Sequence, residues 1–160
     1  MIARLRRTHN ALQILVLRAL PVPARWKEWL VWWLLPRFTI GVEAVILDDA
    51  GRVLVLRSAW HGGWQLPGGA VNYGERLDDA MQREAREELG LALASLERVL
   101  LYLDRSGRRL HALYRGTLAP GEIRLSEEHT AWDYRDLASV PPAVRRAVEA
   151  ARGKPALPPF

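Results

Sequence analysis

The segment from Leu77 to Leu89 limits the fold of this chain more than any other stretch. It reads LDDAMQREAREEL, has neither Gly nor Pro, and is followed by Gly90, which predicts a helix ending at residue 89. On that helix Glu84, Glu87 and Glu88 occupy positions i, i+3 and i+4 and share one face. Neighbouring carboxylates repel one another, and their oxygens suit Mg²⁺ or Mn²⁺ rather than zinc. An acidic helix face considered alone is more often simply solvated, so the surrounding segments decide whether it binds metal.

A second row of residues on this helix is apolar. Met81, Ala85 and Leu89 recur every four residues, so they form a stripe beside the carboxylates. We expect the helix to bury this stripe against a core and to present the carboxylates on its other side.

Most of the chain has the composition of one globular domain. It has 160 residues, of which 49% are hydrophobic and none is Cys, so disulfides, Cys-based zinc sites and cysteine nucleophiles are excluded. Residues 38–47 and 52–57 are rich in β-branched and apolar residues and flank the turn sequence DDAG, which predicts a β-hairpin. Residues 60–74 predict a glycine-rich loop. Strands are expected over 97–104, 109–118 and 122–125, a further segment near Trp132, and a helix over 142–151.

Residues 1–37 differ in character from the rest of the chain. They hold seven of the 23 Lys and Arg residues but only one of the 18 Asp and Glu residues, and four of the seven Trp. Their uncharged stretches are shorter than the roughly 20 residues of a spanning helix. We expect two short amphipathic helices separated by Pro21 and Pro23, forming a helical N-terminal extension before a domain over 38–160. The extension either packs on its own domain or at a homodimer contact, which we favour, or docks on a membrane or partner.

The residues around the acidic helix follow a longer pattern. In chain order they are Gly69, Glu75, Arg83, Glu84, Ala85, Glu87, Glu88, Gly90 and Leu91. Their spacing, G-x5-E-x7-R-E-U-x-E-E-x-G-U with U apolar, resembles the Nudix box at each position, although Ala85 is small for its apolar place. The preceding sequence WQLPGG resembles the lead-in to that box. The resemblance extends more loosely over about residues 38–151 and does not include residues 1–37.

This resemblance implies an α/β protein with the Nudix fold, an α/β/α sandwich around a mixed β-sheet. It implies a Mg²⁺- or Mn²⁺-dependent hydrolase that cleaves a nucleoside diphosphate linked to another moiety, or a nucleoside triphosphate. Glu84, Glu87 and Glu88 would hold the metal, helped by the main-chain carbonyl of Gly68 or Gly69. Hydrolysis of a diphosphate needs such cations, an activated water and in-line geometry.

Two further residues of the box would support the site. The resemblance implies that Arg83 and Glu75 form an ion pair that orients the loop and the carboxylates. The general base would be Glu84 or Glu87. Many family members place another glutamate after the box, and Glu128, rather than Glu127, is the corresponding ligand in our interpretation.

The sequence identifies residues for substrate contacts less specifically than it identifies the residues of the box. His129 is a further acid–base candidate. Trp64 and Tyr73 could stack on a base, and His61 could touch phosphate. The chain lacks the Pro or Tyr that follows the box in relatives acting on ADP-ribose or dinucleoside polyphosphates, so the linked moiety stays open.

Three functions are compatible with the sequence. The first is a cytoplasmic pyrophosphohydrolase acting on a nucleotide-type small molecule, peripheral at the membrane if the extension docks there. The second is an RNA 5′-end pyrophosphohydrolase that uses the basic extension, although we do not expect nucleic acid as a partner. The third is a non-catalytic Nudix-fold nucleotide sensor, which the complete set of box glutamates disfavours.

Overall fold

The computed structural model describes residues 38–104 and 108–153, together with Pro23, Trp26, Trp29 and Trp33. The chain divides into two compact units, Met1–Arg37 and Phe38–Phe160. Of the two helices expected before residue 38, only the helical positions Trp26, Trp29 and Trp33 are described. The remainder of those helices lies outside the described residues, and the assignment of residues 1–37 as an extension stays a prediction.

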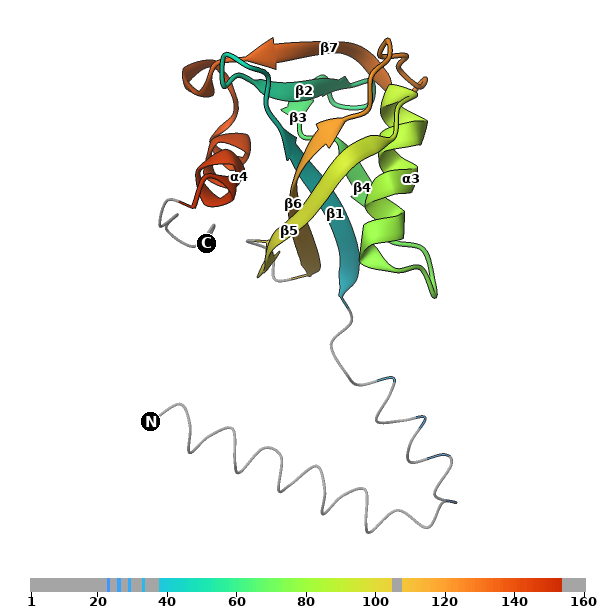
Figure 1. The fold of residues 1–160 in the computed structure, drawn as a ribbon. Helices are drawn as coiled ribbons and strands as arrows, with labels where there is room; N and C mark the ends of the chain where they lie inside the picture. Colours follow the sequence, from blue (N-terminus) through green and yellow to red (C-terminus); the bar gives the residue numbers. More distant parts are fainter. Residues whose placement is uncertain are drawn as a thin grey trace, which may run out of the picture. The chain divides into compact units, whose positions relative to one another are not determined.

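Two β-sheets form the centre of the second unit (Figure 1). One sheet has four strands in the order β4 (Gly68–Ala70), β1 (Thr39–Ile46), β6 (Arg109–Leu118) and β5 (Leu93–Leu103). The other has three, in the order β3 (Trp64–Gln65), β2 (Val53–Ser58) and β7 (His129–Arg135). Strands β1 and β6 run parallel, whereas β4 and β5 pair antiparallel with them. The larger sheet is therefore mixed, as predicted.

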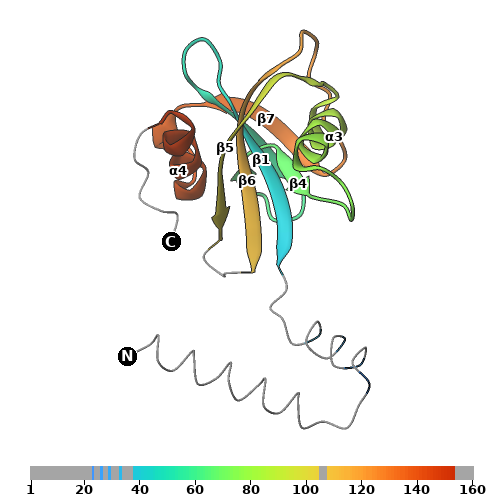
Figure 2. The same cartoon turned by 60° about the horizontal axis from the view of Figure 1, so that its bottom comes forward.

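Two helices enclose these strands. Helix α3 (Leu77–Leu89) and helix α4 (Pro142–Ala151) lie on opposite sides of the four-stranded sheet, which Figure 2 shows with β5, β6, β1 and β4 side by side. A short 3₁₀ turn, η1 (Leu137–Ser139), precedes α4. This arrangement confirms the predicted α/β/α sandwich. Among the described residues no helix is long and apolar enough to cross a membrane.

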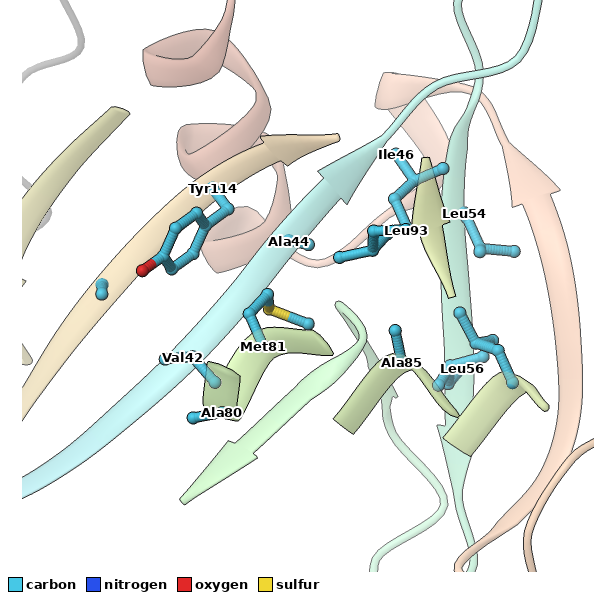
Figure 3. Close-up of a cluster of buried hydrophobic side chains, with 12 residues drawn as sticks. Val42, Ala44, Ile46, Leu54, Leu56, Ala80, Met81, Ala85, Leu93 and Tyr114 are labelled. Carbon is cyan, nitrogen blue, oxygen red and sulfur yellow. The ribbon is translucent and has the colours of Figure 1, made fainter. Parts of the chain in front are cut away.

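Helix α3 covers one core cluster (Figure 3). Its apolar residues Met81, Ala85 and Leu89 are fully buried, which confirms the predicted stripe. They pack with side chains of β1, including Ala44, and with Tyr114 of β6. The helix ends as predicted, because Gly90 has the left-handed φ of 69° and donates its N–H to the Arg86 carbonyl.

A second core cluster lies on the side of α4. Val144 and Val148 of α4 pack there with Val53 and Val55 of β2. The alternate β2 residues, Leu54 and Leu56, belong to the first cluster. Strand β2 is thus buried on both faces, which explains why its sequence is a continuous apolar run.

Three expectations about the strands need correction. Strands β1 and β2 belong to different sheets and pair only beside the turn that joins them, where the Asp48 amide donates to the Arg52 carbonyl and Leu47 bridges Val53, so the predicted hairpin does not extend along the strands. The loop expected over 60–74 contains β3 and β4, which are too short to show a periodic pattern. Residues 122–125 are irregular because the Arg124 amide donates to the Leu89 carbonyl at 2.8 Å, so this backbone closes the end of α3.

Candidate active site

Two glycines let the backbone of β4 approach its neighbours closely. Gly68 has a φ of +146°, and a Cβ atom there would lie 2.1 Å from the Val42 carbonyl oxygen of β1. A Cβ on Gly69 would lie 2.3 Å from Oε1 of Glu84. Any other residue at 68 or 69 would therefore displace β1 or the carboxylate of Glu84.

Glu88 is the most buried carboxylate of α3, with 3% of the residue exposed. Its Oε2 accepts a 2.7 Å hydrogen bond from the Gly68 amide, and its Oε1 lies 3.4 Å from Nε2 of His129. The pKa of Glu88 is raised to about 8, chiefly by burial and also by the charges of Glu84 and Glu128, although the hydrogen bond from Gly68 lowers it. A cation beside Glu88 would oppose these effects.

Arg83 connects the other carboxylates. Its Nη1 donates to Oε1 of Glu84 at 2.8 Å and to Oε2 of Glu87 at 2.9 Å. Its Nη2 also donates to the Ala70 carbonyl at 2.8 Å, which ties α3 to the end of β4. Burial raises the pKa of Glu84, although the hydrogen bond from Arg83 lowers it. One guanidinium thus fixes two carboxylates and the loop.

Glu75 completes this network from the loop before α3. Its Oε1 accepts from Nε of Arg83 at 2.9 Å and its Oε2 from Nη2 at 3.0 Å, which is a bidentate ion pair. Oε2 also accepts the Asn72 amide at 2.9 Å. The hydrogen bonds from Arg83 hold the pKa of Glu75 below its ordinary value. The pair that the box implies is therefore present, and its orienting role stays a prediction.

Glu87 and Glu128 are the solvent-facing acids of the site. The side chain of Glu87 is 57% exposed, in contrast to Glu84 and Glu88. Glu128 is exposed in the turn before β7, and its charge acts on both Glu84 and Glu88. The three helix carboxylates therefore differ in burial, whereas the helical spacing alone predicted one shared exposed face.

The donor set fits a hard divalent cation, although no group of three His, Asp or Glu in the described chain is arranged to hold a metal. Glu84 and Glu87 are turned to Arg83, and Glu88 is turned to Gly68. Two buried carboxylates of raised pKa beside a glycine backbone are oxygen donors whose charge a cation would stabilise. The metal site stays a proposal.

The expected substrate contacts lie in different surroundings. Trp64 is half-buried in β3, and the guanidinium of Arg135 lies 4.0 Å from the centre of its ring. His61 is exposed in the turn between β2 and β3, and Tyr73 is fully exposed before α3. Substrate binding by these three residues stays a prediction.

One neighbour of the site was missed by sequence reasoning. Nε2 of Gln65 lies 3.3 Å from Nε2 of His129, and Nδ1 of His129 is buried without a hydrogen-bond partner among the described residues. Burial lowers the pKa of His129. Gln65 stands within the WQLPGG lead-in, but its partner is 64 residues away and only the fold brings the two together.

Comparisons with known proteins agree with this fold. The family model described as NUDIX domain matches residues 37–155. The crystal structure of a MutT NUDIX hydrolase from Burkholderia pseudomallei is 30% identical, with a TM-score of 0.62 over 71% of this chain and 98% of that chain. A mixed sheet between two helices, with this glycine loop and acidic helix, defines the class of Nudix-domain proteins. The chain belongs to the Nudix hydrolase family.

Curated relatives match shorter parts of the chain. A MutT-like protein of Streptomyces ambofaciens is 30% identical over 96 residues, which are 60% of this chain and 62% of that protein. An RNA pyrophosphohydrolase of Acinetobacter baylyi is 39% identical over 54 residues, 34% of this chain and 32% of that protein. The chain thus spans less than two thirds of the length of either relative.

Proposed function

We propose that this chain is a Mg²⁺- or Mn²⁺-dependent pyrophosphohydrolase. Its substrate would be a nucleoside diphosphate linked to another moiety, or a nucleoside triphosphate. The observation that carries the proposal is the burial of Glu84 and Glu88 against the Gly68–Gly69 backbone, with Arg83 holding Glu84, Glu87 and Glu75. The family membership supports the reaction class.

The residues of the site would have different roles in metal binding and positioning. Glu84, Glu87 and Glu88 would hold the cation with the carbonyl of Gly68 or Gly69, and Glu128 would add a ligand from the turn before β7. When bound, the cation would neutralise phosphate oxygens and favour ionisation of water. Arg83 and Glu75 keep the carboxylates in place, because each is tied to the other by two hydrogen bonds.

We assign water activation to Glu87, with Glu84 as the alternative. Glu87 is the α3 carboxylate of this set that solvent reaches, and Arg83 fixes its position with a 2.9 Å hydrogen bond. It would accept the proton of the attacking water as the water approaches phosphorus in line with the leaving oxygen. Glu84 is less accessible, because the β4 backbone lies against its carboxylate.

The decisive experiment is a turnover screen of the purified full-length chain. Nucleoside triphosphates, nucleotide sugars, CDP-alcohols, dinucleoside polyphosphates and 5′-triphosphate RNA are tested with Mg²⁺, Mn²⁺ or EDTA, and the products are identified. We expect metal-dependent release of a nucleoside monophosphate from one substrate class. Absence of turnover across the panel by folded protein would favour the sensor function instead.

A second candidate is RNA 5′-end pyrophosphohydrolysis. It is favoured by the resemblance to the Acinetobacter baylyi protein over 54 residues and by the basic residues before position 38. If it is correct, 5′-triphosphate RNA is cleaved in preference to the free triphosphate, and its binding falls steeply with salt.

A further inference from the structure

Three of the four tryptophans in residues 1–37 are described by the structure. Trp26, Trp29 and Trp33 are helical, and they are 57%, 57% and 59% exposed. On a continuous α-helix, their spacing of three and four residues would place them within an arc of about 60°, because each residue turns the helix by about 100°. We call these three residues the Trp face. Isolated exposed aromatic residues are ordinary, whereas an aligned set marks an interaction surface.

The segment that carries the Trp face has the charge of a membrane-binding arm. Residues 1–37 contain seven basic residues and one acidic residue, Glu28, whereas the rest of the chain is close to neutral. Indole rings favour the boundary between lipid headgroups and acyl chains, and Lys and Arg are attracted to anionic headgroups. The Trp face and the basic charge are therefore complementary to one kind of surface.

The apolar sequence that contains Trp29 and Trp33 favours lipid over RNA as the binding partner. Residues 29–36 read WLVWWLLP and contain no charge. Proteins that bind single-stranded RNA place their aromatic residues in a positively charged groove, where the charges follow the backbone. An uncharged run of Leu, Val and Trp adds nothing to such a groove, whereas Leu and Val side chains favour the acyl region of a bilayer and Trp favours its boundary. At eight residues it is too short to span one.

We propose that residues 1–37 dock the hydrolase on the surface of an anionic lipid bilayer through the Trp face. The basic residues of the segment supply the long-range attraction, and the tryptophans supply insertion at the interface. This inference does not depend on which nucleotide the active site cleaves.

The test is co-sedimentation of the full-length chain with vesicles of phosphatidylcholine alone or mixed with phosphatidylglycerol. We expect binding to the anionic vesicles, weaker binding at high salt, and a blue shift of Trp fluorescence that bromolipids quench. Trp29→Ala combined with Trp33→Ala should lower vesicle partitioning at least about tenfold. Trp60→Ala is the matched control, because Trp60 is 84% exposed but lies between β2 and β3.

A second variant tests the contribution of the basic residues without altering the tryptophans. Replacing Arg4, Arg6 and Arg7 by Gln removes charge without changing the Trp face and should weaken anionic binding while leaving the melting temperature unchanged. Failure of the folded wild-type chain to bind anionic vesicles overturns the proposal. An equal loss of vesicle binding in the Trp60→Ala control would also overturn it, as would binding of single-stranded RNA but not of vesicles. The same holds if the double Trp variant converts a dimer to a monomer without any change in vesicle binding.

Discussion

The amide of Gly68 donates a 2.7 Å hydrogen bond to Oε2 of Glu88, a residue 20 positions further along the chain. This bond joins β4 to α3 at the point where the carboxylates gather. It also gives a buried carboxylate a partner, which an isolated charge in a core would lack. Because Gly68 is held against Val42 on its other side, the position of Glu88 is tied to the central sheet rather than to a surface loop.

Removing the charge of a proposed ligand should abolish turnover without unfolding the protein. We expect Glu87→Gln and Glu88→Gln each to lower kcat at least about 100-fold, because both the cation site and proton transfer need carboxylates. Asp79→Asn is the control, since Asp79 is an exposed acid of the same helix. Steady-state kinetics with melting curves and Mn²⁺ titration by EPR provide the measurement. Unchanged turnover in both Glu variants would contradict the metal assignment.

Gly69→Ala should disturb the site more than the fold. A Cβ there would meet Oε1 of Glu84 at 2.3 Å, so the carboxylate must move. We expect metal affinity to fall about tenfold or more, measured by calorimetric titration, with a small change in melting temperature. In the matched variant Gly63→Ala, the new Cβ meets only the exposed ring of His61, at 3.3 Å. Equal affinities for the two variants would show that Glu84 is not a ligand.

Arg83→Lys should impair catalysis although charge is conserved. Arg83 donates to five acceptor atoms on Glu75, Glu84, Glu87 and Ala70, and a Lys ammonium cannot reproduce this planar fork. We expect a fall in kcat of about tenfold or more and a loss of roughly 1–2 kcal/mol in the free energy of unfolding. Kinetics and urea denaturation measure both. The control Arg76→Lys, at an exposed position, should leave kcat and the free energy of unfolding unchanged. If Arg83→Lys behaved like the wild type, Arg83 would have no positioning role.

In EDTA, the protein should lose stability as pH rises. The pKa of Glu88 is raised to about 8 from 4.5, so the folded state holds this proton more tightly than the unfolded state. The stability from the bound proton is complete below the unfolded pKa and is lost as pH rises through the folded pKa. We expect the free energy of unfolding to fall by about 1 kcal/mol between about pH 7 and 9, and Glu88→Gln to lack this component.

This pH range is chosen to separate Glu88 from its neighbour. Burial lowers the pKa of His129 from 6.5, so its protonation destabilises the fold only at lower pH. The measurement is urea denaturation of wild type and Glu88→Gln at each pH. Parallel pH profiles for the two proteins would contradict a raised pKa at Glu88.

The acidic helix and its box could be predicted from the sequence because their information is local. The extent of Leu77–Leu89, the ending at Gly90 and the buried row of Met81, Ala85 and Leu89 follow from helical periodicity and from the conformational freedom of glycine. The pairing of Arg83 with Glu75 came from the resemblance to the box, and the structure brings the two together.

Only the tertiary structure decided the relations between distant segments. The parallel pairing of β1 with β6 joins residues 70 positions apart, and no local pattern encodes it. Residues 122–125 have the composition of a strand, but they bind the end of α3 instead. Helical spacing likewise placed Glu84, Glu87 and Glu88 together, whereas the nearness of β4, β7 and Arg83 determines which of them is buried and which meets solvent. Burial depends on what packs against a face, and that is set by contacts far apart in the chain.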